Sequence, residues 1–114
     1  MHELGICDAL LKMVDKIAKD EQLEAIKKIT VEVGTLSGVV PKYLEDCWVA
    51  VVDGTGYADT EFVVDVLVGK AKCLDCGKEF AADINDQLIC PHCGGKKLTP
   101  LTGRDLTLKE IEAY

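Results

Sequence analysis

Four of the six cysteines occur in two matching pairs, and this pattern is the strongest chemical signal in the chain. Cys73 and Cys76 form the first C-x-x-C pair, Cys90 and Cys93 form the second, and 13 residues separate Cys76 from Cys90. A C-x-x-C turn places both sulfurs on one side of a tight loop, and the glycine after each pair permits the backbone conformation of that turn. Because four thiolates close a tetrahedral site, the bound metal is predicted to be structural rather than catalytic.

The chemistry of the four ligands favours Zn(II). Iron is the alternative, because the segment CPHCG also resembles a rubredoxin knuckle. Zinc binding in such peptides contributes roughly 10–16 kcal/mol at neutral pH, enough to fold a segment too short to bury its own core.

The N-terminal segment lacks the pattern of a secretory signal, so we expect a cytoplasmic protein with reduced thiols rather than disulfides. His92, inside the second pair, is predicted to be an exposed spacer; the alternative is a proton- or metal-responsive neighbour of the site.

The first three residues, Met1, His2 and Glu3, form a second candidate metal site. A free α-amine, the following amide nitrogen and the His2 imidazole can surround one ion in a near-planar, nitrogen-rich arrangement. Such tetragonal sites favour Ni(II) or Cu(II) over Zn(II). Taken alone, the tripeptide favours an ordinary exposed terminus over a metal site, because a histidine at position 2 is normally just an exposed terminal residue.

Apolar side chains at three- and four-residue spacing predict two helices. The first covers residues 4–20, and the second begins at Pro41 and ends before the DGTG segment. The apolar stripe of the first helix is Leu4, Cys7, Leu10, Leu11, Val14, Ile17 and Ala18, and that of the second is Leu44, Cys47, Trp48, Val51 and Val52. Cys7 and Cys47 are therefore predicted to be small core residues, and Tyr43, Trp48 and Phe62 to serve in packing.

Alternation with a period of two predicts three strands, over residues 26–34, 61–69 and 103–112. In the first strand, Thr30 is expected to point away from the core, opposite the apolar residues on either side of it. The second strand has apolar residues on both faces, which predicts that it is covered on both sides.

The order of these elements predicts an α+β fold with a two-layer α/β arrangement. We expect a three-stranded mixed sheet with two helices, and an inserted four-Cys zinc-ribbon lobe. The predicted domains are an α/β domain of residues 1–69 and 101–114 and a zinc-binding lobe of residues 70–100.

The charge and hydropathy of the chain argue against several classes of function. The formal net charge is −7, which disfavours a nucleic-acid surface, although residues 70–100 carry five lysines against four acids. No apolar run approaches the ~20 residues that cross a bilayer, so no membrane partner is expected. With two histidines and no phosphate-binding glycine motif, the sequence offers no enzyme active site.

Several segments together resemble the HypA/HybF family of hydrogenase nickel-incorporation proteins over essentially the full length. They are MHELGICDALL, VEVGTLSGVVPKYL, the CxxCG and CPxCG pairs and GRDLTLKEIE. The resemblance implies a nickel metallochaperone that is not an enzyme and that carries Ni(II) as cargo and Zn(II) as a structural ion. Nickel would be bound by His2 with Met1 and Glu3, the latter two chiefly through backbone nitrogen, and zinc by Cys73, Cys76, Cys90 and Cys93.

The resemblance also implies partners for this protein. These are a HypB-type GTPase, the large subunit of [NiFe]-hydrogenase and, in some organisms, urease maturation proteins. Two other functional classes stay open on the residues alone. A rubredoxin-like electron carrier would need iron at the cysteines, and a zinc-ribbon adaptor for nucleic acid would need a basic face.

Overall fold

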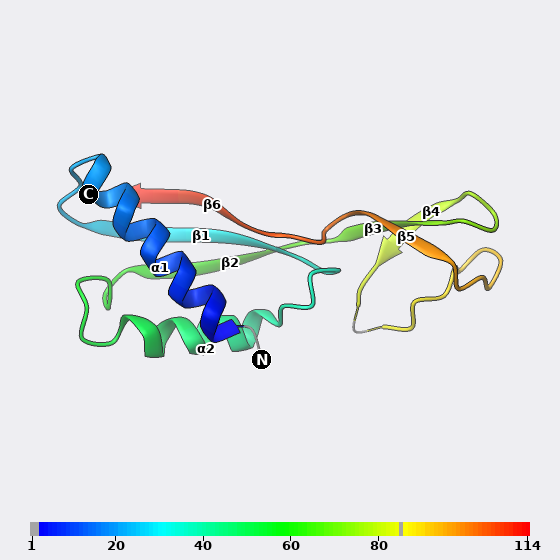
Figure 1. Ribbon diagram of the computed structural model, residues 1–114, viewed down its shortest axis with the longest axis horizontal. Helices are drawn as coiled ribbons and strands as arrows, with labels where there is room; N and C mark the ends of the chain where they lie inside the picture. The colour runs from blue at the N-terminus through cyan, green and yellow to red at the C-terminus, as the bar shows by residue number, and fades with distance from the viewer. Residues whose placement is uncertain (1–2, 85) are drawn as a thin grey trace. The chain divides into compact units, whose positions relative to one another are not determined.

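The computed structural model describes residues 3–84 and 86–114 of the chain, whose helices and strands are labelled in Figure 1. The chain forms two compact units. The first unit comprises the chain up to Glu32, together with Val39–Asp65 and Thr107–Tyr114; the second comprises Val33–Gly38 and Val66–Leu106. The predicted lobe of residues 70–100 lies within the second unit, and its boundaries as a separate domain stay a prediction. Among the described residues, no helix is long and apolar enough to cross a membrane.

The first helix of the first unit, α1 (Glu3–Asp20), packs against the second, α2 (Pro41–Val52). The Cys7 thiol donates a hydrogen bond to the Leu44 carbonyl oxygen at 3.3 Å, which joins the two helices. The prediction that Leu4 belongs to the buried stripe is wrong, because its side chain is 54% exposed whereas Glu3 is buried. The buried residues are spaced by three or four positions, which keeps them on one face of the helix: Glu3, Cys7, Leu10, Val14 and Ala18.

Helix α2 begins at Pro41, as the sequence predicts, and buries Leu44, Trp48 and Val52. Trp48 stacks on Phe62 of the strand β2 (Glu61–Leu67), with ring centroids 4.6 Å apart and planes within 9° of parallel. The packing role of Trp48 is therefore confirmed. Two neighbours differ from the prediction: Cys47 is only half-buried, and Tyr43 is 53% exposed because it lies off the buried stripe.

The sheet of the first unit has the strand order β2-β1-β6, with β1 spanning Ile26–Gly34 and β6 spanning Leu106–Ala113. Figure 1 shows β1 and β2 running in the same direction and β6 in the opposite one, so the sheet is mixed, as predicted. Thr30 was expected to be exposed, but it is buried. The reason is that β1 is the central strand and has a neighbour along each of its edges.

The second unit contains an antiparallel sheet of order β4-β3-β5. Its strands are β3 (Gly69–Cys73), β4 (Glu79–Ala82) and β5 (Leu98–Thr102). This sheet brings the first cysteine, Cys73, opposite Leu98 of β5. The predicted architecture of two helices, a three-stranded mixed sheet and a separate four-cysteine lobe is thus confirmed.

The predicted strand over residues 61–69 is in fact divided. β2 ends at Leu67, and a new strand, β3, begins at Gly69. The side chains of residues 66–68 are exposed, so the expectation that this strand is covered on both faces is wrong at its end. The predicted last strand also starts later, at Leu106, because Gly103 adopts a positive φ of 82° and turns the chain before pairing resumes.

Candidate metal centre

The two C-x-x-C segments fold into two turns with the same backbone hydrogen bonds. In the first turn, the Gly77 N–H donates to the Cys73 carbonyl at 2.8 Å, and the Cys73 N–H donates to the Lys78 carbonyl at 2.9 Å. The second turn repeats this pattern: Gly94 N–H donates to the Cys90 carbonyl at 2.9 Å, and Cys90 N–H donates to the carbonyl of Gly95 at 2.8 Å. Gly77 and Gly94 have φ angles of 76° and 75°, which confirms the predicted need for glycine after each pair.

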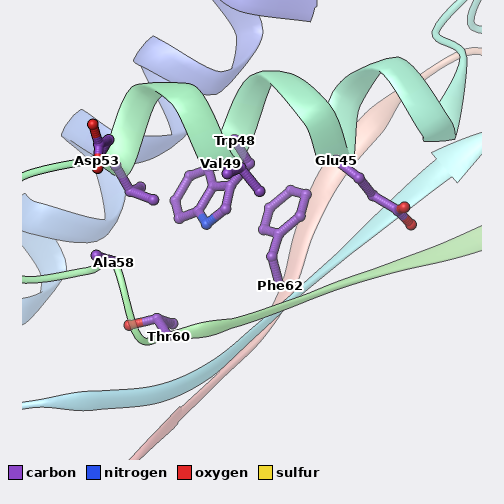
Figure 2. A pocket seen from close by; sticks show the side chains of 8 residues that line it. Glu45, Trp48, Val49, Asp53, Ala58, Thr60 and Phe62 are labelled. Atoms are coloured by element: carbon purple, nitrogen blue, oxygen red, sulfur yellow. The ribbon is translucent and has the colours of Figure 1, made fainter.

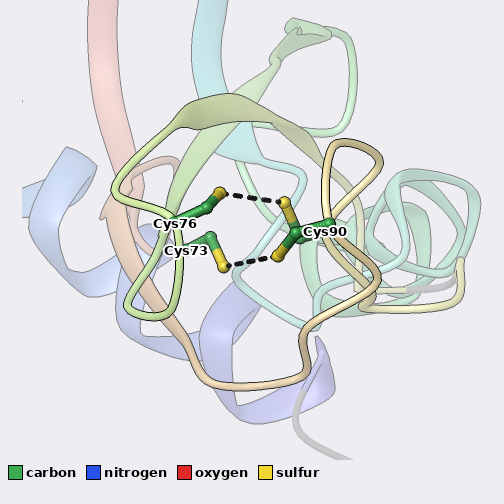
Figure 3. Close-up of side chains that lie close together, drawn as sticks. Cys73, Cys76 and Cys90 are labelled. Carbon is green, nitrogen blue, oxygen red and sulfur yellow. Dashed lines mark hydrogen bonds between the residues drawn. The ribbon is translucent and has the colours of Figure 1, made fainter.

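These two turns bring the four sulfurs together. The ligand atoms of Cys73, Cys76, Cys90 and Cys93 all lie within 4.8 Å of one another. The Sγ atoms of Cys73 and Cys93 are 3.6 Å apart and those of Cys76 and Cys90 are 3.7 Å apart, as Figure 3 shows for the facing turns. Sulfurs placed about 2.3 Å from a central zinc, at the corners of a tetrahedron, lie about 3.8 Å from one another. The donor set therefore fits a tetrahedral ion, and the spacing is far longer than a disulfide bond of about 2.05 Å.

Backbone N–H groups of the second turn point at two of the sulfurs. The His92 N–H donates to Cys90 Sγ and the Gly95 N–H donates to Cys93 Sγ, both at 3.4 Å. Burial raises the pKa of Cys90, but hydrogen bonds from the His92 and Cys93 N–H groups, together with those to the Cys76 and Cys93 side chains, outweigh this effect and lower its pKa to about 7. The thiolate, which is the form that binds a metal, is therefore favoured at Cys90. At Cys76 and Cys93, N–H groups of Lys78 and Gly95 lower the pKa, but burial and hydrogen bonds with neighbouring cysteines outweigh them and raise it.

Gly95 is a residue of this centre that the sequence analysis missed. A Cβ at this position would lie 2.6 Å from Asp75 Oδ2, 3.2 Å from Cys93 Sγ and 3.3 Å from Cys73 Sγ. The backbone of Gly95 therefore lies directly against the sulfur cluster. The available signal was the doubled glycine after the second pair, since Gly94 alone satisfies the turn.

Thr35, in the segment predicted as a loop, is a second residue that the sequence analysis missed. Its hydroxyl donates a hydrogen bond to the Ala82 carbonyl of β4 and accepts one from the Gly69 N–H of β3 at 2.8 Å. Its backbone N–H donates to the Leu67 carbonyl at 3.0 Å, and its carbonyl accepts from the Ile84 N–H at 2.9 Å. Thr35 therefore fixes the ends of the two strands that lead into and away from the first turn.

His92 is exposed, as predicted for a spacer, and it contacts the cluster through its backbone N–H. Of the predicted nickel ligands, Met1 and His2 lie outside the described residues. Glu3 is the first residue of α1, and its side chain is only 6% exposed.

The whole chain is similar to known proteins. The protein family described as "Hydrogenase/urease nickel incorporation, metallochaperone, hypA" matches residues 1–113. The hydrogenase maturation factor HypA of Aquifex aeolicus is 33% identical over 112 residues, which cover 98% of this chain and 96% of that protein. The protein of the same name from Prosthecochloris aestuarii is 34% identical over 111 residues, with 97% of each chain covered.

The fold is also similar to a solved structure, the solution structure of the Ni metallochaperone HypA from Helicobacter pylori. The TM-score is 0.67 at 20% identity, and the match covers 99% of this chain and 97% of the other. At that identity the likeness supports the fold alone.

Proposed function

The chain belongs to the HypA family of nickel-incorporation metallochaperones, and from this premise we propose how it holds and delivers its cargo. As a family member it is a nickel metallochaperone for hydrogenase maturation and not an enzyme. The proposal is that Ni(II) binds at Met1, His2 and Glu3 and passes, with a HypB-type GTPase, to the large subunit of [NiFe]-hydrogenase. The observation that carries it is the family match over residues 1–113, which includes both the N-terminal residues and the cysteine pairs.

The described part of the chain supports a backbone role for Glu3 in the nickel site. Glu3 begins α1, and the first N–H groups of a helix have no acceptor within the helix. Its backbone nitrogen is therefore free of intrahelical bonding, whereas its carboxylate side chain is buried. Together with the His2 imidazole, backbone nitrogens would form a nitrogen-rich site of the kind that favours Ni(II), from which nickel would be released by ligand exchange.

We assign Zn(II) to the four cysteines as a structural ion. Zinc would cross-link the two turns and stabilise the β4-β3-β5 sheet, and it would leave no open position for substrate. The proposed cargo and the proposed structural ion thus occupy different sites. The thiolate cluster retains its ion, and the N-terminal site exchanges its own.

The nickel site is tested by calorimetric titration of Ni(II) into zinc-loaded protein with a free N-terminus. We expect one nickel per chain, with binding lost in His2→Ala and in a form extended by one residue at the N-terminus. His92→Ala is the matched control, because it removes the other of the chain's two histidines. Binding that survives in both N-terminal variants, or that is lost in the control, would contradict the assignment.

The identity of the resident metal is tested by elemental analysis of protein purified from cells without added metal. We expect about one zinc per chain. Iron in its place, with red colour and reversible bleaching on reduction, would instead support the electron-carrier alternative. Cys76→Ser should lower the zinc content and leave the emission of Trp48 in the first unit unchanged, whereas unchanged zinc would contradict the ligand assignment.

The partners are tested by binding of the purified protein to a HypB-type GTPase and to the hydrogenase large subunit. Urease maturation proteins form the second group, because the family description names urease as well as hydrogenase. Nickel transfer from the loaded chaperone should require the intact N-terminal residues. Equal transfer from His2→Ala would contradict this part of the proposal.

A further inference from the structure

A cavity of about 320 Å³ lies in the first unit between α2 and the start of β2, apart from the cysteines. Figure 2 shows its walls, which come from the last turns of the helix, the following loop and the strand. The lining residues used below are Glu45, Trp48, Val49, Asp53, Thr60 and Phe62. None of them belongs to either proposed metal site.

The Trp48 indole presents an unpaired donor to this cavity. Trp48 is 2% exposed, and its Nε1 has no hydrogen-bond partner among residues 3–84 and 86–114. Figure 2 shows this nitrogen facing the space bordered by Ala58 and Thr60. Buried tryptophan N–H groups usually find an acceptor, so this donor indicates a ligand that brings an acceptor oxygen into the cavity.

The remaining walls define what should accompany that oxygen. Phe62 stacks on the indole, and Val49, which is 69% exposed, forms an apolar rim on α2. The Thr60 hydroxyl already donates to the Ile26 carbonyl at 2.8 Å, so its oxygen is left as an acceptor. Because Phe62 and Val49 are apolar, a compact apolar group fits beside the indole.

Two carboxylates mark the ends of the cavity, with Glu45 at one end and Asp53 at the other in Figure 2. Asp53 is the C-cap of α2, and the last turn of that helix holds no basic residue. The negative end of the helix dipole therefore adds to the charge of Asp53 without a cation from the helix itself. The described lining residues include no lysine or arginine, and the whole chain carries a net charge of −7.

We propose that this cavity binds a short segment of a partner protein in which an apolar residue is flanked by lysine or arginine. The apolar side chain fills the cavity, a backbone carbonyl accepts the Trp48 Nε1–H, and the basic side chains pair with Glu45 and Asp53. The eight-residue offset between these two acids corresponds to about 12 Å along a helix. An extended peptide covers that distance in about four residues, which sets the separation of the two basic residues.

The test uses zinc-loaded full-length protein and the capped peptide Lys-Ala-Leu-Ala-Lys. Trp48 is the chain's only tryptophan, so a single indole N–H resonance in the ¹H–¹⁵N spectrum reports on the cavity. We expect a saturable shift of this resonance with the basic peptide. The capped peptide Glu-Ala-Leu-Ala-Glu, of the same length and apolar centre, should cause none. Absence of a saturable shift at millimolar concentrations, or equal shifts with both peptides, would overturn the proposal.

Variants separate the two recognition elements, with affinity measured by the anisotropy of labelled basic peptide. Combined Glu45→Gln and Asp53→Asn should weaken binding roughly 2- to 30-fold. Asp46→Asn is the matched control on the same helix, because Asp46 pairs with Lys42 and does not line the cavity. Trp48→Phe keeps an aromatic ring and removes the donor, and it should weaken binding roughly 2- to 10-fold. If Trp48→Phe does not fold, the charge variant still decides: affinity equal to that of the control excludes the proposed segment.

Discussion

The close approach of two backbone segments in the second unit leads to a sharp prediction for Gly34→Ala. Gly34 is the last residue of β1, and an added Cβ would overlap the carbonyl group of Gly103 and lie 2.5 Å from its Cα. The neighbouring atoms belong to the backbone, so no side-chain rotation can relieve the overlap. The two segments must separate.

The magnitude follows from the hydrogen bonds that join these segments. The Gly34 N–H donates to the Asp105 carbonyl at 3.0 Å, and the Leu36 N–H donates to the Gly103 carbonyl at 2.8 Å. Each bond contributes about 1 kcal/mol net, and each polar group left buried without a partner costs about 1–3 kcal/mol more. We therefore expect Gly34→Ala to lower the free energy of unfolding of the second unit by roughly 3–5 kcal/mol.

Native-state hydrogen exchange at the amides of residues 34 and 36 measures this loss within the second unit. The matched control is Gly5→Ala in α1, where a Cβ meets no atom within 4 Å. The same substitution there should stabilise the first unit by about 0.5–1 kcal/mol, measured by urea unfolding with Trp48 fluorescence. A loss below about 1 kcal/mol for Gly34→Ala, with both amides still protected, would refute the reasoning.

Three further predictions concern the anchoring of the lobe, its metal and one ion pair. Thr35→Val should lower the free energy of unfolding of the second unit by about 1–3 kcal/mol, measured by hydrogen exchange. Thr35→Ser keeps the hydroxyl and should retain most of this free energy. A valine variant as stable as the unmodified protein would exclude the hydroxyl as an anchor. Removal of the resident metal by a chelator should abolish amide protection in β3, β4 and β5 while Trp48 emission stays constant, and persistent protection would contradict a structural metal. Hydrogen bonds from Lys19 and Tyr57 lower the pKa of Asp15 in the folded state. Ionised Asp15 therefore stabilises the fold at pH values above its unfolded-state pKa. This stabilisation is lost as the pH falls through the lowered folded-state pKa. Tyr57→Phe should raise the pKa of Asp15 in an NMR titration and move this loss to higher pH; an unchanged pKa would show that the Tyr57 hydroxyl has no effect.

Features that depend on residues close together in the sequence were predictable. The cysteine ligand set and the roles of Gly77 and Gly94 follow from a turn of a few residues, and the structure confirms the turn. The two helices, the boundaries of β1 and the start of α2 at Pro41 likewise follow from local periodicity and backbone preference. The likeness of several segments to one family identified the function, which the family match over residues 1–113 supports.

Features that depend on neighbours distant in the sequence were decided only by the tertiary structure. Thr30 is buried because β1 became the central strand, and periodicity within one strand cannot reveal which strands lie beside it. The anchoring contacts of Thr35 join it to residues more than thirty positions away. Among the described residues the Trp48 donor is unpaired because the indole face stacks on Phe62 and its N–H faces a cavity rather than an acceptor. Side-chain type determines what a residue can bond to, but only the folded chain determines which partners come within reach.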